Sequence, residues 1–508
     1  MQIARNGARN PVDHPDVVCK LVGPQDQQRD MPELGTDIDA TLQRAAQLAA
    51  EYLASHQDRT VPVARPLPPA ELLSVMNLSL GEEGRPFAEL TSDMEEVLAH
   101  SVRTGHPRFF NQLFGGWDPA SILGEWIAAL INTSMYTYEA APVATLMEVE
   151  IIRRMNQMVG FDKGEGVFAP GGSSSNLMAT LAARHRKFPH AKKEGHRVED
   201  KPVLFLSTEA HYSVLRAATI MGLGLNAAVE VPCDQDGRMV PEALGLAIEE
   251  SIASGKTPFF VNATAGTTVA GAFDPIDKLA DITDKHGLWL HVDASLGGTG
   301  LFSNRHRSLM AGVERADSVT WNPHKLMGVP LACSATLMRE PGILRATNAM
   351  DADYLFHGKS DTCYDLGDMS LQCGRRVDAL KLWFSWQAHG DRGFARRVDH
   401  LFKMTARFRE NVVARSGFEL VREPQSINVC FRYVPDRLRS LSGKKRRDAV
   451  ATCTTHVRAQ MTEQGQFLLN YATVDGSPAY RMVLVNTKTT EEDMTALLDE
   501  IERLSEDI

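Results

Sequence analysis

The chain has 508 residues, of which 43% are hydrophobic and 23% charged, as is ordinary for a soluble enzyme with two or three domains. A formal net charge of −10 argues against a nucleic-acid partner, which would need a concentrated positive field. Seven scattered cysteines without a C-x-x-C spacing indicate neither a disulfide framework nor a metal site, and they favour the cytoplasm. Because no run of about 18 apolar residues occurs, we expect no membrane span.

The N-terminal part, residues 1–107, is predicted to be an arm followed by helices. Residues 1–35 are rich in polar residues, proline and glycine, which is typical of an extended arm. From Ile38 to His56 the apolar residues recur at helical spacing, and a second helical stretch covers Leu72 to Met76 after several prolines. This part is expected to contact a partner subunit.

Residues 108–380 are predicted to form a large α/β domain with a mostly parallel central sheet. Helical runs cover 122–131 and 144–159, and beyond them short apolar runs alternate with helical spans, as parallel sheets require. Residues 381–508 are expected to form a small C-terminal α+β domain with strands near 428–433 and 480–485. The strands predicted in the large domain are 203–207, 228–231, 259–263, 288–293 and 318–320.

Two residues point to an aldehyde cofactor. Lys325 follows Pro323 and His324, and Asp293, at the end of an apolar run, precedes it by about thirty residues. A lysine with an accessible neutral form can make a Schiff base, and a carboxylate can keep a pyridine nitrogen protonated. Either residue alone is more often an ordinary surface lysine or a buried aspartate. Together with the residues described below, they predict pyridoxal 5'-phosphate.

A glycine-serine segment suits the phosphate of that cofactor. Gly171 and Gly172, followed by Ser173 and Ser174, precede a helical run at 177–187. A glycine turn that opens a helix presents free N–H groups and the positive end of the helix dipole. Taken alone, such a segment is more often a flexible loop.

From about His106 to Arg376, and again around Arg481, the chain resembles the group II pyridoxal-phosphate decarboxylases, in the branch of the glutamate, cysteine sulfinate and aspartate decarboxylases. The resemblance implies a fold-type I enzyme, a homodimer, and active sites at the subunit interface. It is carried by HPRFFNQLF, NTSMYTYEAAPV, FAPGGSSSN, AHYS, VNATAGTTVAGAFDP, LHVDAS and SVTWNPHKLMGV.

The resemblance also assigns roles. His211 would stack on the cofactor ring, although a lone histidine is usually structural, and Tyr354 would protonate the carbanion from a flap that runs to Gly367. Lys325, Tyr354 and His211 are therefore the expected catalytic residues. The expected cofactor contacts are Ser173, Ser174, His211, Thr264, Asp293, Ala294, Asn322, His324 and Lys325.

For the substrate, Arg481 is expected to pair with an acid group, with Gln112 as a second donor. Phe114 and Ser134 resemble the residues of the cysteine sulfinate and aspartate enzymes, and a ring at position 114 would shorten the pocket. We expect aspartate to give β-alanine, or cysteine sulfinate to give hypotaurine. Glutamate decarboxylation to γ-aminobutyrate stays an alternative, as do transamination or oxidative deamination and a catalytically inactive scaffold on the same fold.

Overall fold

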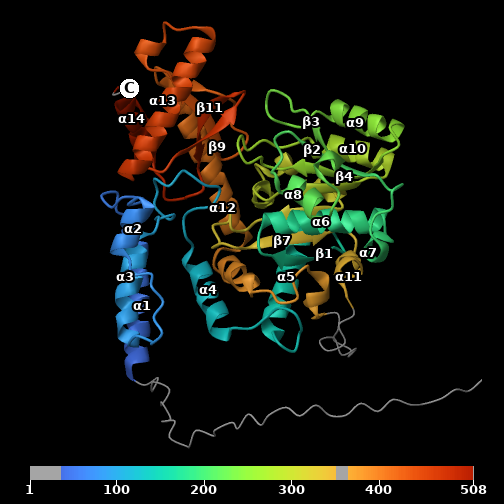
Figure 1. The fold of residues 1–508 in the computed structure, drawn as a ribbon, viewed down its shortest axis with the longest axis horizontal. Coiled ribbons are helices and arrows are strands. Elements are labelled where there is room, and N and C mark those ends of the chain that lie inside the picture. Colours follow the sequence, from blue (N-terminus) through green and yellow to red (C-terminus); the bar gives the residue numbers. More distant parts are fainter. Residues whose placement is uncertain (1–35, 351–363, 507–508) are drawn as a thin grey trace, which may run out of the picture.

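The computed structural model describes residues 36–350 and 364–506. Three helices, α1 (Thr36–Ser55), α2 (Pro69–Val75) and α3 (Leu90–His100), form a column at one edge of the molecule, and α1 packs against α3 (Figure 1). The large sheet with its helices fills the other side (Figure 1). Among the described residues, no helix combines the length and apolarity needed to span a bilayer.

The central sheet has seven strands in the order β1-β7-β6-β5-β4-β2-β3. β7 is antiparallel to both of its neighbours and the remaining pairs are parallel, which confirms the predicted mostly parallel sheet. β1 and β7 were not predicted. The strands are β1 (Glu165–Ala169), β2 (Pro202–Ser207), β3 (Ala228–Val231), β4 (Thr257–Thr264), β5 (Trp289–Asp293), β6 (Ser318–Trp321) and β7 (Ser334–Met338).

Proline and glycine mark several of the helix ends in this unit. Several start with proline in the first turn, where its missing N–H costs nothing, and α5 ends at Gly160 with φ 96°. They are α4 (Pro119–Ile131), α5 (Pro142–Val159), α6 (Gly172–Lys187), α7 (Ala191–Glu194), α8 (Ser213–Ile220), α9 (Pro241–Ala253), α10 (Ile276–His286) and α11 (Ile343–Asn348).

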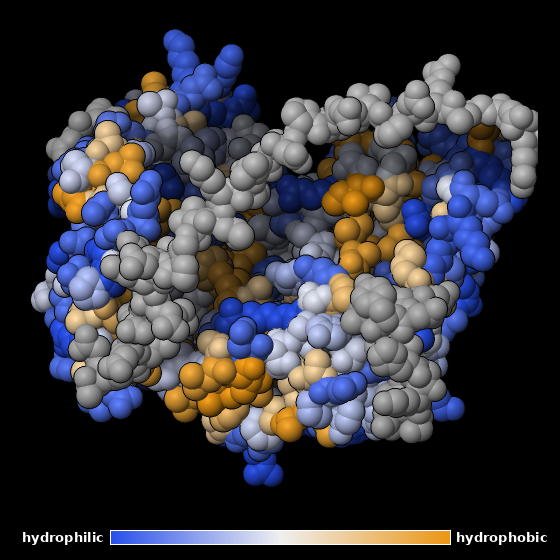
Figure 2. All heavy atoms as spheres, turned by 60° about the horizontal axis from the view of Figure 1, so that its bottom comes forward, coloured by the Kyte–Doolittle hydropathy of each residue, from blue (hydrophilic) through white to orange (hydrophobic). Residues whose placement is uncertain are grey.

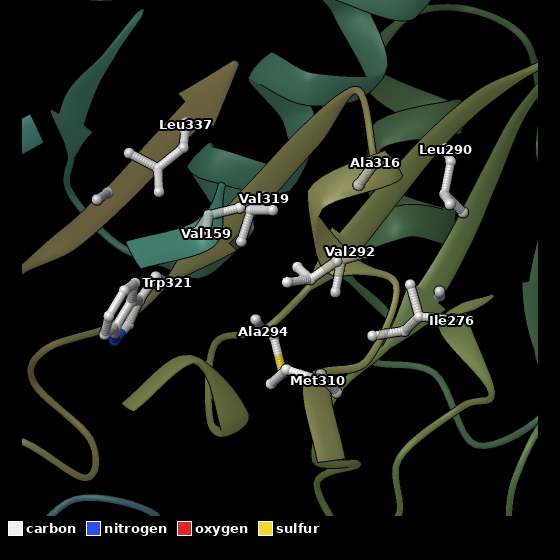
Figure 3. Packing of buried hydrophobic residues seen from close by; sticks show 14 of the residues in the cluster. Val159, Ile276, Leu290, Val292, Ala294, Met310, Ala316, Val319, Trp321 and Leu337 are labelled. Carbon is white, nitrogen blue, oxygen red and sulfur yellow. The ribbon is translucent and has the colours of Figure 1, made fainter. Parts of the chain in front are cut away.

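Alternation along β5 sends neighbouring side chains to opposite faces of the sheet. Leu290, Val292 and Ala294 enter one apolar core together with residues of α10 and β6 (Figure 3). Trp289 packs in the second core, with residues of α6. The polar residues His291 and Asp293 share this second face and are buried as well.

The C-terminal unit begins with α12 (Asp378–Ala414), which is interrupted at Gly390 with φ 59°. Its antiparallel sheet has the order β10-β11-β9-β8. The predicted boundary at 380 falls within the first turn of α12, and the domain ranges stay predictions. The other elements are β8 (Phe418–Leu420), β9 (Asn428–Tyr433), α13 (Gly443–Gln464), β10 (Asn470–Val474), β11 (Ser477–Val483) and α14 (Glu491–Glu506).

Candidate active site

A cavity of about 190 Å³ lies where β4, β5 and β6 end, at the carboxyl edge at which parallel sheets place ligands. Thr264 ends β4 and Asp293 ends β5, while Asn322 follows β6 directly. The first turn of α6 closes another side. The lining residues are Gly172, Ser173, Asn176, His211, Thr264, Gly266, Thr268, Asp293, Ser295, Asn322, His324 and Lys325.

Lys325 lines this cavity and is partly buried. Burial lowers the pKa of Lys325 below its usual value, and the Asp293 carboxylate opposes this shift only in part. A lowered pKa increases the fraction of neutral amine, which is the form that attacks an aldehyde. Lys325 is thus suited to covalent attachment of a carbonyl compound.

Asp293 stays ionised although it is buried. Burial favours its neutral form, but Lys325 and the hydrogen bonds from Ser295 and Asn176 outweigh it, so the pKa of Asp293 lies below its usual value. The backbone N–H of Ser295 donates to Oδ1 at 3.1 Å, and Asn176 Nδ2 donates to Oδ2 at 2.8 Å. The cavity therefore contains a fixed negative charge that can retain a ring proton.

The first turn of α6 gives the cavity a wall that suits a phosphate. Helix α6 starts at Gly172, where a β-carbon would lie 2.7 Å from Asn322 Nδ2 and 2.9 Å from Ser295 Oγ, so these polar groups approach bare backbone. Asn322 Oδ1 accepts a hydrogen bond from Ser334 Oγ at 2.6 Å, which leaves the amide NH₂ beside the glycine turn. Ser173 lines the cavity, whereas Ser174 does not. Helix-terminal N–H groups and an amide NH₂ form a donor set that fits a phosphate.

Two histidines border the site in neutral form. Burial lowers the pKa of His324 to about 4, and its Nδ1 lies 2.5 Å from the carbonyl oxygen of Cys333. Burial also lowers the pKa of His211, and Nδ1 of His211 accepts from the N–H of Ser213 at 3.2 Å. A neutral His211 ring therefore carries its proton on Nε2 and can donate from it.

The predicted substrate residues are not among those that line this cavity. Arg481, on β11, donates from Nη1 to the carbonyl oxygen of Thr268 at 3.1 Å and from Nη2 to that of Asn111 at 2.8 Å. Since Thr268 lines the cavity, Arg481 lies directly behind its wall. Phe114 lines a second cavity of about 300 Å³, which shares only His324 with the first.

Seven predicted residues thus converge on one cavity, whereas Ser174, Ala294, Gln112, Phe114, Ser134 and Arg481 lie outside its lining. Ala294 packs in the core on the other face of the sheet. Tyr354 lies outside the described residues. The converging residues are Ser173, His211, Thr264, Asp293, Asn322, His324 and Lys325.

Three polar residues of the site received no role in the sequence analysis: Asn176, Thr268 and Ser295. Asn176 lies three residues after Ser173 in the same helix, so helical spacing could have assigned both to one face. Ser295 follows Asp293 by two residues, which is the spacing at which an aspartate accepts from the backbone. No local signal marks the carbonyl group of Thr268.

Residues 69–434, more than half of the chain, match the family profile described as "Pyridoxal-dependent decarboxylase conserved domain". The chain belongs to this family. Among similar proteins, the cysteine sulfinic acid decarboxylases of Homo sapiens and Mus musculus are 43% and 44% identical over 449 residues, or 87% of this chain and 90% of each relative.

Solved structures agree. The crystal structure of mouse CSAD has a TM-score of 0.90 at 40% identity and covers 93% of this chain and 99% of that chain. The glutamate decarboxylase domain of a Vibrio parahaemolyticus diaminobutyrate-pyruvate transaminase and L-2,4-diaminobutyrate decarboxylase has a TM-score of 0.80 at 26% identity, over 94% of this chain and 98% of that chain. This decarboxylase therefore has the predicted fold class, a fold-type I α/β architecture.

Membership in the pyridoxal-dependent decarboxylase family confirms the predicted cofactor, pyridoxal 5'-phosphate, and the predicted enzyme class, a carboxy-lyase that acts on an amino acid. The residues of the cavity fit this cofactor on their own chemistry. An amine with a lowered pKa, an ionised carboxylate and a phosphate-type donor set border one space. Lys325, Asp293 and the first turn of α6 are the groups that would hold it.

Proposed function

We propose that this decarboxylase removes the α-carboxylate of a small acidic amino acid, either cysteine sulfinate, giving hypotaurine, or aspartate, giving β-alanine. The names of its relatives at 43–44% identity support cysteine sulfinate. The observation that carries the acidic substrate class is the state of Arg481.

Arg481 is a buried cation that pairs with no carboxylate among the described residues. It is 7% exposed, two backbone carbonyl oxygens accept its hydrogen bonds, and its Nε has no hydrogen-bond partner among the described residues. Burial also lowers the pKa of Arg481. Because a buried guanidinium without an anion is costly, a substrate carboxylate or sulfinate would be bound favourably.

The protein groups divide the remaining work among them. When bound, pyridoxal phosphate supplies a ring that accepts the electron pair left by departing CO₂. The amine of Lys325 would hold the aldehyde group of the cofactor. Asp293 would retain the proton on the ring nitrogen, and the first turn of α6 with Asn322 and His324 would hold the phosphate. His211 Nε2–H offers a donor on the substrate side.

Protonation of the α-carbon is assigned to Tyr354, which belongs to the flap 354–367. The described end of this flap is attached to the loop before α5. The N–H of Tyr138 donates to Asp365 Oδ1 at 2.9 Å, and the N–H of Gly367 donates to the carbonyl oxygen of Tyr136. These contacts anchor one end of the segment that carries the proposed acid.

We propose further that the enzyme is a homodimer with active sites at the subunit interface, and that it resides in the cytoplasm. Large apolar side chains of α4 and α5 are exposed. Figure 2, in which the bottom of the Figure 1 view comes forward, shows apolar patches on that face. Such an exposed apolar face is typical of an obligate interface. The apolar residues are Leu123, Trp126, Ile127, Leu130, Ile131, Val143, Leu146 and Val149.

The proposed location in the cytoplasm is supported by the cysteines. The five described cysteines are free thiols, which suits a reducing compartment.

The test is a product assay. The purified, cofactor-loaded protein is given cysteine sulfinate, aspartate or glutamate separately, and CO₂ and amine are quantified. We expect kcat/KM for the first two to exceed that for glutamate, and Lys325→Ala to lose turnover and the cofactor absorbance near 410–430 nm. A preference for glutamate would make glutamate decarboxylase the better description. Full activity of Lys325→Ala would reject the site.

A further inference from the structure

Behind the cavity, four side chains form a continuous series of hydrogen bonds that ends on Asp293. Trp289 Nε1 lies 2.8 Å from Ser318 Oγ, and the same hydroxyl lies 2.8 Å from His291 Nδ1. His291 Nε2 lies 3.1 Å from Asn176 Oδ1, and Asn176 Nδ2 lies 2.8 Å from Asp293 Oδ2. We call Trp289, Ser318, His291 and Asn176 the donor relay.

The relay follows from strand alternation and register. Trp289, His291 and Asp293 occupy alternate positions of β5 and so share the face that α6 covers. His291 pairs in register with Ser318 of β6. Asn176 descends onto this face from the first turns of α6. All five residues are buried, with at most 6% of any side chain exposed.

The direction of the hydrogen bonds can be deduced from the Asp293 end. At the other end, the indole N–H of Trp289 can only donate, so Ser318 Oγ accepts it and keeps its own proton for a further hydrogen bond. An ionised Asp293 can only accept, so Asn176 presents its NH₂ group to the carboxylate. That NH₂ group also donates to Ser213 Oγ at 2.8 Å, which leaves Oδ1 of Asn176 facing His291.

The Asp293 end therefore fixes the tautomer of His291, and the Trp289 end is compatible with it. Nδ1 of His291 accepts from Ser318, and Nε2 must donate to Asn176 Oδ1. A neutral ring satisfies this with its single proton on Nε2, and burial keeps the ring neutral by lowering the pKa of His291 to about 4. The hydroxyl of Thr320 lies 3.4 Å from the same Nε2 and can accept as a second partner.

We propose that Trp289, Ser318 and His291 are positioning residues that fix the Asn176 amide so that Asp293 always meets a donor, which strengthens cofactor binding. This inference rests on the role proposed for Asp293. Without the hydroxyl of Ser318, His291 can move its proton to Nδ1 and offer a lone pair to Asn176. The amide would then rotate, and its oxygen would face the carboxylate. Because aligned donors polarise one another in a dry interior, the loss would reach Asp293.

Two variants break the relay at separate points. Ser318→Ala removes the donor to His291, and Trp289→Phe removes the first donor of the series. The matched control is Trp321→Phe, since Trp321 Nε1 also donates to a buried hydroxyl, that of Thr299 at 3.2 Å, but packs in the core on the other face of the sheet. Ser318→Thr keeps a hydroxyl and should restore the parent behaviour.

The main readout is the dissociation constant of pyridoxal phosphate, titrated by protein fluorescence, with thermal unfolding measured in parallel. We expect Ser318→Ala to bind the cofactor about 10–100-fold more weakly, the range for losing a hydrogen bond to a charged group, and Trp289→Phe about 3-fold more weakly or worse. Trp321→Phe should bind the cofactor as tightly as the parent does, although it should lose about as much thermal stability as the two relay variants. Equal losses of affinity in all three variants would show a merely structural role and overturn the inference.

A double-mutant cycle tests whether the relay acts through Asp293. In an Asp293→Asn background, Ser318→Ala should have almost no further effect on cofactor affinity, whereas an undiminished effect would reject the inference. Failure of the proposed function looks different: the parent would take up no pyridoxal phosphate, or Lys325→Ala would keep the cofactor absorbance. If the parent binds the cofactor through Lys325 while Ser318→Ala and Trp289→Phe bind as tightly as the parent, only the relay inference falls.

Discussion

Arg481 donates from Nη1 to the carbonyl oxygen of Thr268 at 3.1 Å, and this contact joins the C-terminal sheet to the wall of the cofactor cavity. Asn428, on the neighbouring strand β9, donates to the same carbonyl at 3.1 Å. The candidate anion site therefore exists only where the two units of the molecule meet. Substitutions in the C-terminal unit should affect substrate affinity without altering the cofactor chemistry.

Arg481→Gln should lower kcat/KM for acidic substrates by about 10–100-fold, mainly through KM, because a charge-assisted pairing is lost. Cofactor absorbance should be retained. The control is Arg432→Gln, since Arg432 on β9 also donates to backbone carbonyls, those of Val474, Ser477 and Pro478. Steady-state kinetics of both variants test this prediction. If kcat/KM falls equally in both variants, Arg481 has no specific role in substrate binding.

Asp293→Asn should keep the cofactor but lower the rate of CO₂ release by about 100-fold or more, because a neutral amide cannot retain the ring proton. The new NH₂ group would also face one of the two groups that now donate to Asp293, the amide of Asn176 or the backbone N–H of Ser295. Single-turnover CO₂ release measures the effect. Asp317→Asn, at the opposite edge of the sheet, serves as the control. A rate close to that of the parent would mean that another group protonates the ring.

Phe114→Ser tests the length of the substrate pocket. The ring of Phe114 lies 6.1 Å from that of Phe109 and faces the second cavity. If it limits the substrate, the smaller serine should raise glutamate turnover relative to aspartate by about 10–200-fold, the range commanded by one methylene. Phe114→Leu, which keeps an apolar side chain, should change the ratio far less. An unchanged ratio in competition assays would show that Phe114 does not set chain length.

Leu130→Glu tests the proposed subunit interface. Leu130 is 78% exposed on α4, in the middle of the apolar face that we assign to the dimer. A buried, unpaired carboxylate at this point should shift the protein from dimer to monomer, because burying a charge without a partner is costly. Light scattering after gel filtration gives the mass. Leu246→Glu, on α9, is similarly exposed at 62% and should not change it. A dimer that survives Leu130→Glu would place the interface elsewhere.

Asp274 gives the stability a defined pH dependence. Burial raises the pKa of Asp274 to about 6, despite hydrogen bonds from the N–H groups of Met239 and Thr264, whereas the usual value is 3.8. The folded state thus holds this proton more tightly than the unfolded state. Its contribution is complete below a pH of about 4 and is lost as the pH rises through about 6.

Asp274→Asn removes this titration. Relative to the parent, the free energy of unfolding of the variant should increase by about 3 kcal/mol between a pH of about 4 and a pH of about 7. Urea unfolding at several pH values gives the difference directly. A difference that stays constant over this range would show that Asp274 titrates normally in the folded protein.

Local sequence determined much of this protein. Apolar runs separated by helical spans predicted the parallel strands β2 to β6, and the glycines before Ser173 predicted that a helix follows, although α6 begins at Gly172 and not at 177. The spacing of Asp293 and Lys325 predicted the cofactor. Because these features depend on backbone geometry and side-chain chemistry within a few residues, they can be predicted from the sequence alone.

Only the tertiary structure decided which distant groups meet. Asn176 reaches Asp293 across 117 positions of sequence, and Arg481 reaches Thr268 across 213. The pattern marked Trp289, His291 and Ser318 as residues of buried strands, but not as one directed series of donors. Phe114 lines a second cavity that shares only His324 with the first, and its role in the substrate pocket stays a prediction. Such contacts depend on strand order, on register and on which helix covers which face, and these are settled by the packing of the whole sheet because no local segment carries that information.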